Sequence, residues 1–197
     1  VPCSFTSPFI GASDVVGMFT NIDRQECLNA VGVFCDEMWK YDNRGKPLKL
    51  KLKRRTVLWV DPGSRSDRGA WTRNEIVGIV QRALALACFR CGRRIRVQSN
   101  GLPLGHHLSA VLSRITVAHY EVRNIPTLVR KCPCGVGHPL TVARWQDDTV
   151  FLQRVPRSLS PDDWRKALTS IYPSSLELEW AAGTGNGADG ANVVWTD

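Results

Sequence analysis

Runs of apolar residues, several of them alternating with polar ones, predict β-strands along this chain. The predicted strands cover residues 9–16, 48–53, 93–98 and 176–180, a hairpin spans 143–152, and a last strand begins at Val193. Residues 48–53 alternate leucine with lysine, so this strand has one cationic face. That face either guards a sheet edge against aggregation or contacts a nucleic-acid backbone, and the pattern fits both.

Apolar residues spaced three and four apart predict four helices. They cover about residues 20–40, 72–89, 105–122 and 160–171, with an irregular connection over 123–140. The second helix opens with a capping box formed by Thr72 and Glu75. The fourth has Ser160 as its N-cap, followed by Pro161 at the first helical position.

The order of these elements mixes helices with a sheet whose strands we expect to be antiparallel, which predicts an α+β fold. The chain has 197 residues, enough for one compact domain with its own core. It begins at Val1 and carries no evident terminal signal, so we expect a fragment of a larger protein, truncated at both ends. We find no internal repeat.

Charge and cysteine content indicate which kind of molecule the protein could bind and in which cellular compartment it is expected. Lysine and arginine outnumber aspartate and glutamate by 26 to 18, which suits a polyanionic partner without identifying one. The seven cysteines are an odd number in a chain without a secretory signal pattern, so we expect reduced thiols. No apolar run approaches the roughly 20 residues that cross a bilayer. We therefore expect a nuclear or cytoplasmic protein that is not secreted and has no membrane partner.

Three aspartates lie within or beside predicted β-strands, at positions where an acidic side chain is unusual or has a possible function. Asp147 and Asp148 are adjacent at the tip of the predicted hairpin, where carboxylate oxygens can hold a divalent cation. The simpler interpretation is a polar turn, since aspartate is common in turns. Asp14 interrupts an apolar run, and a buried carboxylate must be compensated by a metal, a cation or hydrogen bonds.

Between these acids lies a loop with glycine at 101 and 105, proline at 103 and serine at 109. Taken alone, it predicts only a turn before a helix. Taken in order with the acid strand and the double-acid hairpin, it resembles motif B of reverse transcriptases, with motifs A and C on either side. The resemblance is nearest to the Penelope-like retroelement and telomerase branch. It is carried by residues 18–22 (Met-Phe-Thr-Asn-Ile), 71–76, 89–98, 119–121 and 193–197.

This resemblance implies a right-hand polymerase palm over residues 1–197, with partial fingers around 38–100 and no thumb. The implied activity is RNA-directed DNA synthesis for a retroelement, although the fragment can be inactive by itself. Two Mg²⁺ ions, replaceable by Mn²⁺, would be held by the catalytic acids Asp14, Asp147 and Asp148. The implied partners are an RNA template, a DNA primer and deoxynucleoside triphosphates.

The resemblance also implies contacts to the nucleotide and template. Phe19, five residues after Asp14, falls at the steric-gate position that excludes a 2′-hydroxyl, although it also suits a core aromatic. The remaining implied contacts are Gln98, Gly101, Pro103, Leu104, Gly105 and Ser109. The sequence departs from the family at Leu104, at Ala110 and at Trp145-Gln146, and it fixes no proton donor in the motif D segment around Arg165 and Lys166.

Two other functions remain open. The first is a non-catalytic, basic nucleic-acid-binding module with a zinc site, whose ligands would be Cys88, Cys91, Cys132 and Cys134 together with His138. The second is a decayed or domesticated reverse transcriptase that binds nucleic acid without polymerising. The three intact acids argue against decay.

Overall fold

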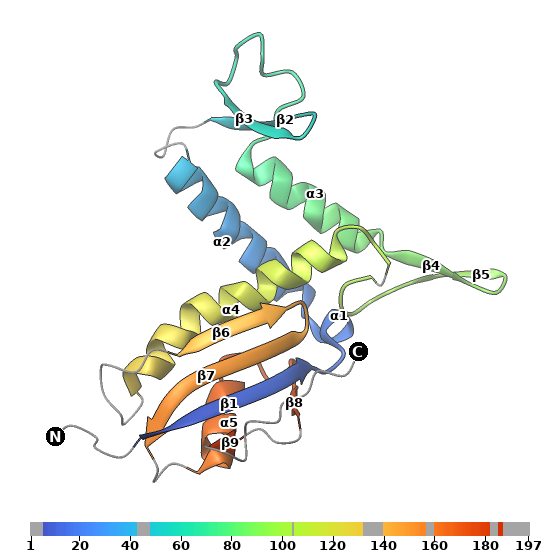
Figure 1. The fold of residues 1–197 in the computed structure, drawn as a ribbon. Coiled ribbons are helices and arrows are strands. Elements are labelled where there is room, and N and C mark those ends of the chain that lie inside the picture. The colour runs from blue at the N-terminus through green and yellow to red at the C-terminus, as the bar shows by residue number, and fades with distance from the viewer. Residues whose placement is uncertain are drawn as a thin grey trace. The chain divides into compact units, whose positions relative to one another are not determined.

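The computed structural model describes residues 6–42, 48–103, 105–131, 140–156, 160–181 and 185–186. These residues form a mixed α+β structure with antiparallel sheets, which confirms the predicted fold class (Figure 1). The chain divides into two compact units. Unit 1 consists of Val1–Asn21 and Tyr120–Asp197, and unit 2 is the continuous segment Ile22–His119. The assignment of the chain to a single palm with partial fingers stays a prediction.

Unit 1 is built on an antiparallel sheet with the strand order β6-β7-β1-β8, and β9 pairs with β1 as well. Its strands are β1 (Thr6–Val15), β6 (Thr141–Trp145), β7 (Asp148–Pro156), β8 (Leu178–Trp180) and β9 (Gly185–Asn186). The central pair is β1 with β7, in register from Thr6 opposite Pro156 to Asp14 opposite Asp148. The predicted first strand and hairpin are therefore confirmed. The expected strand at Val193 lies outside the described residues.

Alternate residues of the central strands bury one face of this sheet. Phe9, Phe151 and Val155 are fully buried on that face. Helix α5 (Pro161–Thr169) adds Trp164 and Leu168 to the buried set and lies behind the sheet in Figure 1. The predicted Ser160 cap is present, because its hydroxyl accepts a hydrogen bond from the Asp163 N–H. The opposite face of β7 carries exposed Leu152 and Arg154.

Helix α4 (Ser109–Lys131) is longer than the sequence pattern predicts. The expected end near residue 122 and the irregular connection over 123–131 are both wrong, although Pro126 lies inside the helix. Contacts made after the expected end explain why the helix continues. The Asn124 amide donates to the Ile171 carbonyl oxygen, and Arg130 Nε donates to the Pro126 carbonyl oxygen at 3.1 Å.

Unit 2 contains helices α2 (Arg24–Asp42) and α3 (Arg73–Ala85) and two separate two-stranded ribbons. The first ribbon pairs β2 (Lys49–Lys53) with β3 (Thr56–Val60), and the second pairs β4 (Cys88–Cys91) with β5 (Arg94–Val97). The two helices are joined by an ion pair in which Arg73 Nε lies 2.8 Å from an Asp36 carboxylate oxygen. The capping box of Thr72 and Glu75 is present as predicted.

The end of α3 differs from the prediction. The helix was expected to reach residue 89, but it ends at Ala85, and Cys88–Cys91 form a strand. Pairing with β5 explains the change, because the Gln98 N–H donates to the Ala87 carbonyl oxygen at 2.9 Å and draws the chain into a ribbon. The spacing of apolar residues within a segment gives no information about a strand later in the chain with which that segment can pair.

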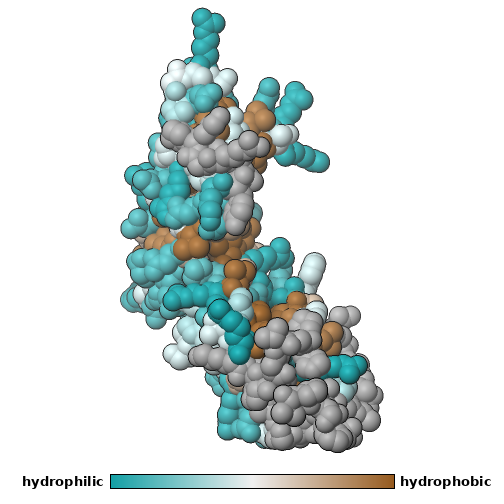
Figure 2. Space-filling view, turned by 90° about the vertical axis from the view of Figure 1, so that its left-hand side faces the viewer, coloured by the Kyte–Doolittle hydropathy of each residue, from teal (hydrophilic) through white to brown (hydrophobic). Residues whose placement is uncertain are grey.

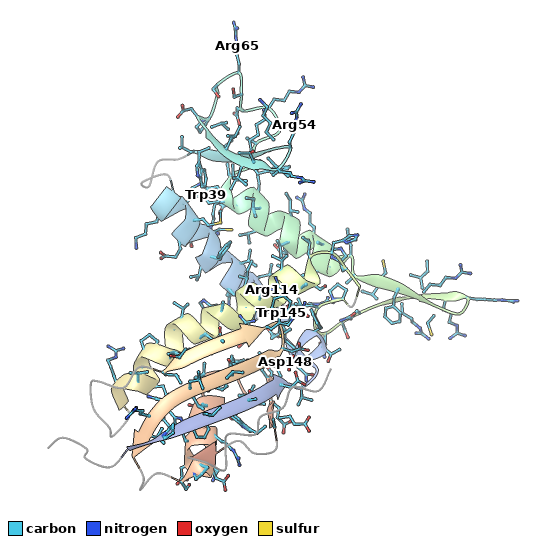
Figure 3. The ribbon with its side chains drawn as sticks, in the orientation of Figure 1. Trp39, Arg54, Arg65, Arg114, Trp145 and Asp148 are labelled. Carbon is cyan, nitrogen blue, oxygen red and sulfur yellow. The ribbon has the colours of Figure 1, made fainter. Side chains whose placement is uncertain are left out.

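The β2–β3 ribbon is fixed by aromatic and ionic contacts within unit 2. Trp39 packs edge-to-face on Trp59 with ring centroids 4.7 Å apart. Lys49 pairs with Asp67 at 2.8 Å, so part of the cationic face is already neutralised by the following loop. Arg54 in the turn of this ribbon and Arg65 in the loop after β3 both point outward (Figure 3). On the molecular face in Figure 2, hydrophobic surface forms small areas among hydrophilic residues.

The described helices include none that is both long enough and apolar enough to cross a membrane. The longest of them, α4, carries arginine at 114, 123 and 130 and histidine at 119.

Candidate functional site

The three acids singled out from the sequence lie at one end of the unit 1 sheet. Asp14 on β1 is directly opposite Asp148 on β7, so their side chains share one face of the sheet. Trp145 pairs with Asp148 across the hairpin, which leaves Gln146 and Asp147 as a two-residue turn. The Asp147 carbonyl oxygen accepts a hydrogen bond from the Val15 N–H at 3.1 Å. Strand pairing therefore brings together acids that are far apart in the sequence.

The turn that carries Asp147 has an unusual backbone. Gln146 has φ +56°, in the left-handed region that favours glycine. Two-residue hairpins require such values, and this chain meets the requirement with a glutamine. Arg144 Nη1 donates to the Gln146 carbonyl oxygen at 2.9 Å and supports the turn from the β6 side. Asp147 is thus held in place by hydrogen bonds on both flanks of the turn.

The acids repel one another. Partial burial, followed by the negative charges of Asp147 and Asp148, raises the pKa of the Asp14 carboxyl above its ordinary value. A hydrogen bond from the Val15 N–H opposes this rise in pKa only in part. The site is therefore one where a bound cation would relieve electrostatic strain between carboxylates.

A fourth acid, Glu179, joins this face and was missed in the sequence analysis. It lies on β8 directly opposite Asp14, so Asp148, Asp14 and Glu179 form a row across three neighbouring strands. Its charge also contributes to the raised pKa of Asp14. The alternation of Leu178 and Trp180 could have placed Glu179 on the opposite face of its strand, but nothing in the sequence indicates that β8 pairs with β1.

The donor chemistry of this site suits a hard divalent cation. Carboxylate oxygens are the ligands that Mg²⁺ prefers, and Asp14, Asp147 and Asp148 would supply them. The mutual repulsion of these acids, which raises the pKa of Asp14, is the observation in favour of a cation. Within the described ranges, however, no three or more His, Cys, Asp or Glu side chains converge in a metal-binding arrangement. The two Mg²⁺ ions, or Mn²⁺ in their place, stay a prediction.

Phe19 follows Asp14 on a sharply turned segment. The chain leaves β1 through Gly17, which has φ +55°, and enters the short helix α1 (Met18–Asn21). Thr20 Oγ1 donates to the Gly17 carbonyl oxygen at 2.8 Å, and Asn21 Nδ2 donates to the Val16 carbonyl oxygen at 3.0 Å. These side chains hold Phe19 half-buried immediately after the acid strand. The steric-gate role stays a prediction.

The loop resembling motif B is organised by hydrogen bonds within unit 2. Gln98 Nε2 donates to the carbonyl oxygens of Asn100 at 2.7 Å and Leu102 at 3.1 Å. Ser109 Oγ donates to the Pro103 carbonyl oxygen at 2.5 Å. Two of the expected template contacts, Gln98 and Ser109, therefore hold the loop together.

The glycines of this loop have different surroundings. Gly101 is buried with φ +70°, whereas Gly105 is exposed with φ +77° and has open space around it. Leu104 lies outside the described residues. Contacts with nucleotide or template stay predictions for all six residues of this segment: Gln98, Gly101, Pro103, Leu104, Gly105 and Ser109.

The zinc prediction gains no geometric support. Cys88 and Cys91 are exposed free thiols three residues apart on β4, so they point to opposite faces of the ribbon. A zinc knuckle instead places its cysteine pair in a turn that faces one ion. Cys132 and Cys134, with His138, lie outside the described residues.

A buried polar network supports the acid end of the sheet from the next layer. Arg144 Nε lies 2.9 Å from Glu121 Oε1, and the Tyr172 hydroxyl donates to the same oxygen at 2.8 Å. The ion pair is mostly buried, with exposed side-chain fractions of 12% for Arg144 and 15% for Glu121. Burial beside this carboxylate raises the pKa of Tyr172 far above its ordinary value. The network was not predicted because its members are distant in sequence.

Comparison with known proteins does not assign the chain to a family. The chain matches no protein-family model, and no curated protein is significantly similar to it.

Proposed function

We propose that this chain is the palm-containing core of an RNA-directed DNA polymerase of a retroelement, similar to the Penelope-like branch of reverse transcriptases. The observation that carries the proposal is the pairing of Asp14 with Asp148 across β1 and β7, with Asp147 in the adjoining turn. Two strands that present carboxylates at one sheet end fit a nucleotidyl-transfer site. The order of the three sequence motifs supports the same function.

In this proposal each residue of the site has a distinct task. Asp14 and Asp147 are the principal cation ligands, and Asp148 is the more peripheral one. Two divalent cations held by these acids would activate the primer hydroxyl and neutralise the triphosphate charge. The Val15 N–H and Arg144 keep the turn that carries Asp147 in one conformation. Phe19 excludes nucleotides with a 2′-hydroxyl.

The substrates follow from this assignment. They are an RNA template, a DNA primer and deoxynucleoside triphosphates, all of them polyanions that suit the formal net charge of +8. The palm and partial-fingers arrangement and a nuclear or cytoplasmic location belong to the same proposal.

The test is primer extension on an RNA template by the 197-residue chain with Mg²⁺ or Mn²⁺, alongside Mn²⁺ binding followed by electron paramagnetic resonance. Asp147→Asn is expected to abolish synthesis while leaving template–primer binding intact. Asp61→Asn, which removes an exposed acid in unit 2, is the matched control and should behave as the wild type. Equal synthesis by the Asp147→Asn variant overturns the proposal.

If the wild-type chain synthesises no DNA, the Mn²⁺-binding measurement still tests the proposed cation site. If Mn²⁺ binds to the wild type and binding weakens at least tenfold in Asp14→Asn, the cation site is supported. If Asp14→Asn leaves Mn²⁺ affinity unchanged and no synthesis occurs, the polymerase proposal is rejected. Template binding without either property favours the non-catalytic nucleic-acid-binding module.

A further inference from the structure

Negative side chains are absent from a long central part of the sequence. No aspartate or glutamate occurs between Glu75 and Glu121, whereas the same stretch holds six arginines and no lysine. The arginines are Arg82, Arg90, Arg93, Arg94, Arg96 and Arg114. Four of the six fall on the β4–β5 ribbon or its connecting turn, so the positive charge is concentrated there.

The β4–β5 ribbon is exposed along its whole length. All eight of its strand residues are exposed, and the ribbon extends away from α3 in Figure 1. Gly92 has φ +63° and begins the two-residue turn that places Arg93 at the tip. A ribbon of two strands gains little stability from its own pairing. This one therefore presents its side chains to solvent without burying them in a core.

Strand register sorts these side chains onto two faces. Phe89 lies opposite Arg96, and Cys91 lies opposite Arg94, on one face. The other face carries Cys88, Arg90, Ile95 and Val97. Phe89 is 52% exposed, so the first face combines an accessible aromatic ring with two guanidinium groups. We call residues 89, 91, 94 and 96 the aromatic–arginine face.

Among the described residues, Arg94 and Arg96 have no acidic partner that would account for them. In the described part of the chain, Arg94 and Arg96 form no ion pair with a carboxylate, unlike Arg73 and Arg144, which are each paired with an acid. Edge protection by charge is the usual alternative, but it does not explain an exposed phenylalanine directly opposite Arg96. The face is charged, aromatic and unneutralised, as expected of a surface that binds a polyanion.

We propose that the aromatic–arginine face of the β4–β5 ribbon binds single-stranded nucleic acid, with Phe89 stacking on a base and Arg94 and Arg96 contacting the flanking phosphates. Arginine suits this task better than lysine because its planar guanidinium bonds phosphate oxygens in pairs. A ring that stacks on a base requires an unpaired strand, since bases in a duplex are already stacked. The proposal concerns binding alone and does not depend on catalysis at the acids.

The test is fluorescence anisotropy with labelled 20-nucleotide oligouridylate and oligothymidylate, measured with the whole chain over a range of salt concentrations. Arg94→Gln/Arg96→Gln is expected to weaken binding at least tenfold and to reduce the salt slope by about 1.4, because each lost contact to a single strand removes about 0.7. Phe89→Leu keeps an apolar side chain without an aromatic face and should weaken binding at least fivefold.

The matched control is Arg82→Gln/Arg123→Gln, which removes the same charge from two exposed positions that are not part of the ribbon. It should change affinity less than threefold. The proposal is overturned if Arg94→Gln/Arg96→Gln binds within twofold of the wild type, or if the control loses as much affinity. Equal affinity for a 20-base-pair duplex would overturn the single-strand assignment.

Two further measurements test whether the ribbon variants lose affinity through misfolding or through a change in oligomeric state. Circular dichroism and thermal unfolding should be unchanged in the ribbon variants, because their side chains are exposed. Sedimentation velocity should show no change in oligomeric state. A wild-type dimer that Ile95→Ser converts to a monomer would instead assign the ribbon to self-association. Asp147→Asn tests synthesis, whereas Arg94→Gln/Arg96→Gln tests oligonucleotide binding, so failure of the polymerase proposal is distinguishable from failure of this one.

Discussion

Arg24 Nε donates a 2.8 Å hydrogen bond to the carbonyl oxygen of Gly101, a residue 77 positions later in the chain. The same guanidinium donates through Nη2 to the Gln98 carbonyl oxygen at 2.8 Å. One side chain at the start of α2 therefore holds both sides of the glycine loop. The loop geometry that resembles motif B depends on a residue outside the motif.

Replacing Arg24 by alanine should destabilise unit 2. Two partly buried carbonyl oxygens would lose charged donors, at a cost of about 2–3 kcal/mol in the free energy of unfolding. Urea unfolding measures this loss. Arg82→Ala removes an exposed arginine and should cost less than about 0.5 kcal/mol. Equal stability of Arg24→Ala and the wild type would show that the two hydrogen bonds do not stabilise the loop.

Asp14 should make the protein less stable at neutral pH than in mild acid. Its pKa is higher in the folded state than in the unfolded chain, so the folded state binds more protons between the two pKa values. The free energy of unfolding therefore falls as the pH rises through this interval. Asp14→Asn should raise the free energy of unfolding at pH 7, and this gain should disappear below the ordinary aspartate pKa of 3.8. Urea unfolding at both pH values tests the sign, and a larger gain in acid contradicts it.

Glu179→Gln should lower the pKa of Asp14 towards its ordinary value. The glutamate is opposite Asp14 on β8, and its charge is the smallest of the contributions that raise this pKa. The pKa should move downward and only slightly, because Glu179 is exposed and its charge is the smallest of the contributions. Carbon-detected NMR titration of the Asp14 carboxyl group measures it. Glu177→Gln is the control, because Glu177 lies outside β8.

Gln146→Gly should stabilise the hairpin. Glutamine at φ +56° is strained, and glycine adopts this conformation freely, so a gain of about 0.5–1 kcal/mol is expected. Arg54→Gly offers a parallel case, since Arg54 has the same φ in the β2–β3 turn. Thermal unfolding compares the two variants. A loss of stability in both would mean that the entropy of glycine in the unfolded chain outweighs the strain.

Tyr172→Phe should cost about 1–2 kcal/mol, because it removes a donor from the mostly buried Glu121 carboxylate. Glu121→Ala should cost more, about 3–5 kcal/mol, since it leaves Arg144 buried without its acid. Urea unfolding ranks the two variants. The reverse order of destabilisation would contradict the ion-pair interpretation.

The sequence predicted correctly those features of the fold that depend on residues close together in the chain, such as helix caps and the hairpin. Thr72 and Ser160 both cap their helices as expected, since each cap needs only neighbours within three residues. The hairpin around Asp147 followed from alternation and a polar tip. The length of α4 did not follow, because the sequence places Pro126 where helices commonly end, and the stabilising contact to Ile171 comes from a distant segment.

The candidate site shows the same division. Asp14, Asp147 and Asp148 were found from their own contexts, and β1–β7 pairing brings them together. Glu179 and the Arg144–Glu121–Tyr172 network were missed, because each requires knowledge of which strands and helices become neighbours. The side chains of Gln98 and Ser109 bond the loop backbone, and their expected contacts with nucleotide or template stay predictions.

The division of the chain into a continuous unit 2 inside a discontinuous unit 1 has a consequence for biosynthesis. Strand β1 leaves the ribosome first, but its partner β7 follows only after every residue of unit 2 has been made. Unit 2 can therefore fold while β1 is still unpaired. A folded unit 2 replaces a long flexible connection between the two acid strands, which lowers the entropy cost of closing the loop when they pair.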